Sequence, residues 1–179
     1  MNFQFNLKLI ENEVELRNID ETNEDVFELI KGYLEIVNNH ENFLININQY
    51  YFMEFFNLES IPDLRIPIIS FIFELSQFYV KRENYDVFRL TEDFIPFEFV
   101  FIKEDQYMSV FLHSKFKSLW YDGEKVSKIK PKSSKFKIPN KEFYEAIDRS
   151  LRNIHSYLTI NYPTLMNNPL VKKSFYKMN

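Results

Sequence analysis

The sequence predicts a single α+β domain: an antiparallel sheet of about six strands with about three helices packed on one face. Apolar residues alternate with polar ones near the N-terminus and across residues 87–130, as in half-buried strands. Elsewhere apolar residues recur every three or four positions, as on the buried face of a helix. No internal repeat or linker divides the 179 residues, so we expect one domain over residues 1–179.

The N-terminus carries the clearest strand pattern. Phe3, Phe5, Leu7 and Leu9 alternate with polar residues and predict a strand over residues 3–9. The same period continues through residues 11–16, so we expect a second strand to pair back with the first.

A helix is predicted next. Thr22 stands three residues before Asp25, as in a capping box, and acidic residues suit the positive end of a helix dipole. Apolar residues then recur at helical spacing from Val26 to Val37, which predicts a helix that ends at about Asn38.

The middle of the chain gives weaker signals. Residues 43–48 alternate like a strand, whereas residues 50–58 are apolar on both faces and fit a buried strand or a helix. Pro67 can begin a helix at its first position, and the apolar stripe that follows predicts a helix to about residues 81–82.

Residues 87–130 predict an antiparallel meander. Alternating segments at 97–102 and 108–112 are separated by a polar turn. Asp122-Gly123 lies between two apolar segments and predicts a tight hairpin, because both central residues of such turns need positive φ. Pro131 is expected to end the last strand, and residues 131–139 are expected to form a basic loop.

The C-terminal quarter predicts helices. Asn140 is expected to cap a long helix whose buried stripe steps by three or four residues from Phe143 to Leu158. Pro163 should stop this helix, and residues 163–179 are expected to form a C-terminal docking segment with a short helix that begins at Asn168-Pro169.

The composition argues against several chemistries. The chain has 20 Phe and 11 Tyr but two Gly and no Cys, which excludes disulfides, thiolate catalysis and thiolate metal ligands. The three His residues show no zinc-binding spacing, so we expect no metal and no cofactor. Neither a signal peptide nor an apolar segment long enough to cross a membrane is present, which favours the cytoplasm.

Charge is distributed unevenly along the chain. Residues 1–63 contain thirteen acidic and three basic residues, a net charge of −10. Residues 114–141 contain nine Lys against two acidic residues, a net charge of +7. Such asymmetry indicates charged partners rather than a particular fold.

The acidic N-terminal third suggests a surface that docks a basic protein. Its predicted partner-binding residues are Glu11, Glu13, Glu15, Glu21, Glu24, Asp25 and Glu28. We therefore expect a non-enzymatic protein-binding protein. The composition also favours residues with AT-rich codons, so we expect its source to be a bacterium or phage. It would resemble, in type only, the small acidic inhibitors (immunity proteins) that neutralise a basic partner such as a toxin.

Two alternatives remain open. A nucleic-acid-associated module would use the Lys115–Lys137 hairpin and loop, where lysines can follow phosphates and Trp120 can stack on a base. Its candidate residues are Lys125, Lys128, Lys130, Lys132 and Trp120. An enzyme whose site is assembled from distant residues is the second alternative, and no motif in the sequence supports it.

Overall fold

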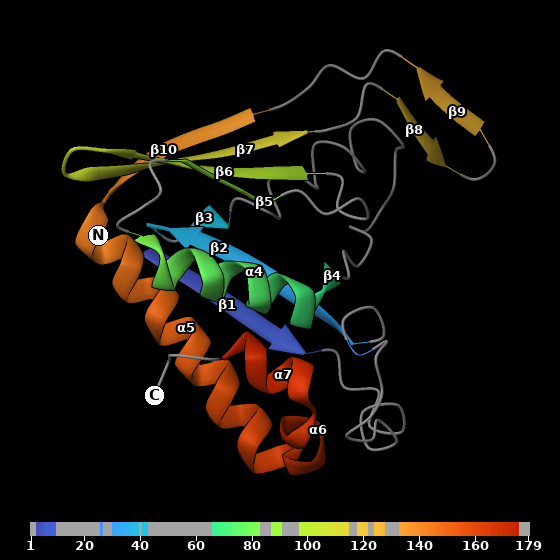
Figure 1. Ribbon diagram of the computed structural model, residues 1–179. Helices are drawn as coiled ribbons and strands as arrows, with labels where there is room; N and C mark the ends of the chain where they lie inside the picture. The colour runs from blue at the N-terminus through green and yellow to red at the C-terminus, as the bar shows by residue number, and fades with distance from the viewer. Residues whose placement is uncertain are drawn as a thin grey trace.

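The computed structural model is an α+β fold whose strands form antiparallel sheets (Figure 1). It describes residues 3–9, 26, 30–39, 41–42, 66–82, 87–90, 97–114, 118–121, 124–127 and 133–175. Its strands are β1 (Phe3–Leu9), β2 (Lys31–Asn38), β3 (Glu41–Asn42), β4 (Ile66–Pro67), β5 (Val87–Leu90), β6 (Phe97–Glu104), β7 (Tyr107–Ser114), β8 (Ser118–Tyr121), β9 (Glu124–Ser127) and β10 (Ser133–Pro139). Its helices are α4 (Ile68–Val80), α5 (Asn140–Asn161), α6 (Pro163–Asn167) and α7 (Pro169–Ser174).

The predicted N-terminal strand is confirmed as β1, but the helix predicted to end at Asn38 is wrong over its second half. Residues 31–38 form β2, which pairs antiparallel with β1 so that Phe5 lies opposite Ile36. Gly32, Leu34 and Ile36 are all buried, which is the period of a strand.

Gly32 shows how tightly β2 packs. A Cβ atom at this position would lie 2.5 Å from the backbone oxygen of Lys8 and 2.7 Å from the Ile68 side chain. Ile68 is the first residue of α4, and its N–H donates to the Ile30 carbonyl at 3.0 Å. The absence of a side chain at residue 32 therefore lets β1, β2 and the start of α4 meet.

The predicted meander is confirmed, although its strands belong to separate sheets. One sheet has the order β10-β7-β6-β5, and a second contains β1-β2-β3 with β4 also paired to β2. The predicted Asp-Gly hairpin is the two-stranded pair β8-β9, in which Tyr121 lies opposite Glu124. A single six-stranded sheet is therefore not what the described strands form.

The predicted basic loop is also wrong over most of its length. Ser133–Pro139 is strand β10 and pairs antiparallel with β7, where Lys135 lies opposite Phe111 and Lys137 opposite Ser109. Phe136 and Ile138 point to the core side of this strand, and Ile138 is fully buried. Phe136 and Ile138 thus alternate with Lys135 and Lys137 in the period of a strand.

Both long helices predicted from apolar stripes are confirmed as α4 and α5. The α5 stripe is buried throughout, from Phe143 to Leu158. Asn140 does not cap α5 with its side chain. Its Nδ2 donates instead to the Asp105 carbonyl at 2.7 Å, and its N–H donates to the Gln106 carbonyl at 2.9 Å, which ties α5 to the β6–β7 turn.

Residues 163–174 of the C-terminal segment form two short helices, α6 and α7. Pro163 begins α6 after α5 has ended, and the side chain of Asn168 caps α7 by accepting from the N–H of Leu170 at 2.9 Å. Val171 and Phe175 are buried, and α7 packs against α4.

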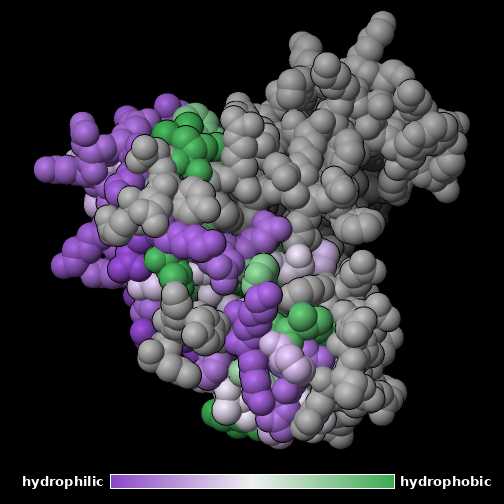
Figure 2. Space-filling model, viewed as in Figure 1, coloured by the Kyte–Doolittle hydropathy of each residue, from purple (hydrophilic) through white to green (hydrophobic). Residues whose placement is uncertain are grey.

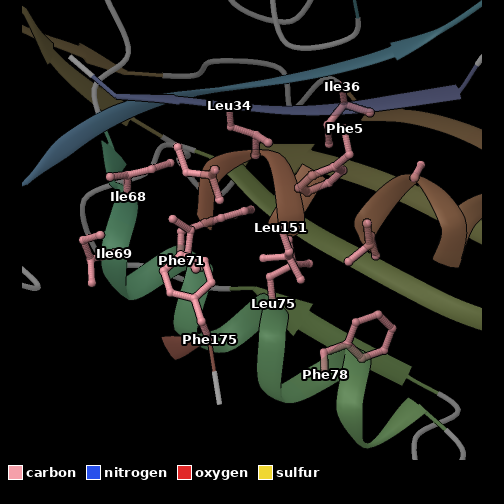
Figure 3. Packing of buried hydrophobic residues seen from close by; sticks show 14 of the residues in the cluster. Phe5, Leu34, Ile36, Ile68, Ile69, Phe71, Leu75, Phe78, Leu151 and Phe175 are labelled. Atoms are coloured by element: carbon pink, nitrogen blue, oxygen red, sulfur yellow. The ribbon is translucent and has the colours of Figure 1, made fainter. Parts of the chain in front are cut away.

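The core lies where both four-stranded sheets meet α4 and α5. Figure 3 shows Phe5, Leu34 and Ile36 pointing from β1 and β2 toward Phe71, Leu75 and Leu151 on these helices. The Phe5 and Phe71 rings stack at 5.9 Å. From the other sheet, the Phe101 ring reaches Phe143 at 5.0 Å.

One face of the molecule is shown by hydropathy in Figure 2. The described residues on this face are mostly hydrophilic, with hydrophobic side chains in small separate patches. Of the helices that the structure describes, none combines the length and the apolar character needed to cross a bilayer.

Candidate functional site

A groove runs between β1 and α5. It is a hollow of about 480 Å³ that adjoins a second hollow of about 400 Å³, and the two share Leu7, Lys8 and Asn153. One wall consists of six consecutive residues of β1, residues 3–8, with Leu9 in the second hollow. Successive side chains of a strand point to opposite faces of the sheet. A wall that includes every residue in turn is therefore the edge of the strand and not one of its faces.

The groove follows β1 for its whole length. At one end the N–H of Phe3 donates to Oε1 of Glu142 on α5 at 3.3 Å, and at the other end Leu9 shares a hollow with Tyr157. Residues 3–9 extend about 20 Å as a strand. Residues 142–157 rise about 22 Å along a helix. The strand and the helix therefore run side by side in the same direction (Figure 1).

The edge of β1 that faces this groove has no strand partner among the residues that the structure describes. Because the N–H of Phe3 points to α5 and not to β2, the N–H and C=O groups of Phe5 and Leu7 point the same way. Within the described ranges β1 pairs only with β2, and no hydrogen bond reaches the N–H of Phe5 or Leu7 from the groove side. An open strand edge is a row of donors and acceptors that a second strand can use.

The α5 wall supplies polar groups. Arg149, Ser150 and Asn153 line the first hollow on the side of α5 next to its buried stripe. The Ser150 side chain is 5% exposed, and its Oγ has no hydrogen-bond partner among the described residues. Arg149 is exposed and forms no ion pair with any residue of the described part of the chain.

The two cations of the groove differ in their surroundings. Nζ of Lys8 lies 3.2 Å from a carboxylate oxygen of Glu35, which also accepts from the amide of Asn6 at 3.4 Å. The charge of Lys8 is thus paired with Glu35. The guanidinium of Arg149 has no such ion pair among the described residues.

The predicted acidic docking residues cannot be placed. All seven, from Glu11 to Glu28, lie outside the residues that the structure describes. Their role therefore stays a prediction from sequence.

The predicted nucleic-acid residues are only partly placed. Trp120 and Lys125 lie opposite each other in the β8-β9 pair, whereas Lys128, Lys130 and Lys132 lie outside the described residues. The neighbouring lysines of β10 already have partners. Lys137 donates to Glu104 and lowers the pKa of that carboxyl, and Lys135 lies 4.6 Å from the centre of the Phe111 ring.

A second polar cluster joins the end of α4 to α5. The guanidinium of Arg82 lies 4.7 Å from the centre of the Tyr79 ring, and Nε of Arg152 donates to Asp148 at 2.8 Å. Burial, and then the charge of Asp148, raise the pKa of Tyr79; the hydrogen bond to Asp148 raises the pKa of Arg152. Tyr79 of α4 is hydrogen-bonded to Asp148 of α5, so this cluster links the two helices.

Among the side chains that the structure describes, the Ser109 hydroxyl donates to the Glu104 carboxylate at 2.8 Å, and Lys137 also donates to that carboxylate. The ring of His155 packs on Phe175 at 5.0 Å, His40 is outside the described residues, and the side chain of His113 is not described. Among the residues that can be placed, no three His, Cys, Asp or Glu converge as metal ligands would.

Comparison with protein-family models, curated proteins and solved structures gave no significant match. The sequence alone did not predict the groove between β1 and α5. The one available signal was Ser150, a polar residue directly before the buried Leu151 on α5.

Proposed function

We propose that this chain is a non-enzymatic protein-binding protein that receives one extended segment of its partner along the outer edge of β1. The observation that supports this proposal is that no described strand pairs with the outer edge of β1, which lines a hollow beside α5. Proteins bind peptides in this way by adding a strand to an exposed sheet edge, with the main chain giving affinity and neighbouring side chains giving specificity.

The nature of the partner is a further part of the proposal. The net charge of −10 over residues 1–63 favours a partner with a basic surface, as expected for an immunity or inhibitor-type protein of a bacterium or phage acting in the cytoplasm. The same charge would make association fast and sensitive to salt. The nucleic-acid alternative gains no support from β10, because its lysines at 135 and 137 are engaged within the fold.

The L7P variant tests the edge. Proline removes the N–H of Leu7, which faces the groove and does not bond to β2, so β1 should still pair with β2. We expect the variant to fold but to bind its partner about tenfold more weakly or worse, since one donor is lost and the proline ring obstructs strand addition.

The measurement is a pull-down from the native host at low and high salt, followed by affinity measurement with the protein recovered. L7A is the matched control, because it removes the same side chain and keeps the N–H. Equal affinity of L7P and L7A would overturn the proposed binding edge. Nucleic acid in the bound fraction, retained by both variants, would move the function to the lysine-rich hairpin.

A further inference from the structure

We draw no further inference here: the strongest candidate, the face of the β10-β7-β6-β5 sheet that points away from α4 and α5 and leaves Val87 44% and Tyr107 47% exposed, carries none, because nothing in the described part of the chain shows what covers it.

Discussion

The F143A variant is expected to lose about 3–5 kcal/mol of unfolding free energy, a large share of the stability of a domain of this size. Phe143 is fully buried at the start of α5, where both four-stranded sheets converge. Its ring lies 5.0 Å from Phe101 of one sheet, 5.8 Å from Phe3 of the other and 6.4 Å from Phe78 of α4. Alanine would leave a cavity that none of these rings can fill without moving away from its own neighbours.

Urea denaturation followed by circular dichroism measures this loss. S156A is the control, because Ser156 is exposed on the same helix and its replacement should change stability by no more than about 0.5 kcal/mol. A loss below about 1 kcal/mol for F143A, well under the range for a buried Phe, would mean that the two sheets do not share a core through Phe143.

The second large change in unfolding free energy is expected for G32A, and a loss and a gain of stability would have different meanings. In β2 the new methyl group would lie 2.5 Å from the Lys8 carbonyl oxygen, which is backbone and cannot rotate away. We expect a loss of about 3 kcal/mol, at the upper end of the range for overpacked sites. If residues 31–38 were a helix, as their sequence predicts, alanine would instead stabilise the protein by up to about 1 kcal/mol.

Thermal and urea unfolding of G32A therefore distinguish strand from helix at this position. Q4A serves as the control, since Gln4 is exposed on β1 and its loss should be nearly neutral. An increase in stability for G32A would contradict the pairing of β1 with β2.

The sequence correctly predicted the elements in which the spacing of apolar residues fits a helix or a strand but not both. The stripe from Phe143 to Leu158 can only be one face of a long helix, and β1 alternates without exception. Residues 31–38 have two interpretations. Tyr33, Leu34 and Val37 fit a helix, whereas Gly32, Leu34 and Ile36 fit a strand, and pairing with β1 settles the choice. Local pattern does not contain this long-range partner.

The division into separate sheets was not predictable for the same reason. Alternation shows which side of a strand is buried, but it does not show which strand lies beside it. Lysines at 135 and 137 indicated a solvated loop, yet Ile138 between Lys137 and Pro139 is fully buried in β10. Charge on one face of an edge strand resembles a loop when it is read along the sequence alone.

The candidate groove depends entirely on tertiary structure. Its walls come from residues 3–9 and 149–157, which are separated by most of the chain. The sequence predicted a strand over residues 3–9 and a long helix that begins at Asn140 and stops before Pro163. It did not show that the two run side by side, or that no described strand pairs with the outer edge of β1.

Residue-resolved amide hydrogen exchange of the free protein tests the central claim, the open edge of β1, most directly. The N–H groups of Gln4, Asn6 and Lys8 face β2 and should exchange slowly, whereas those of Phe5 and Leu7 face the groove and should exchange much faster. A bound partner should slow Phe5 and Leu7 selectively. Slow exchange of Phe5 and Leu7 in the free protein, equal to that of their neighbours, would show that the edge is already paired and would contradict the account.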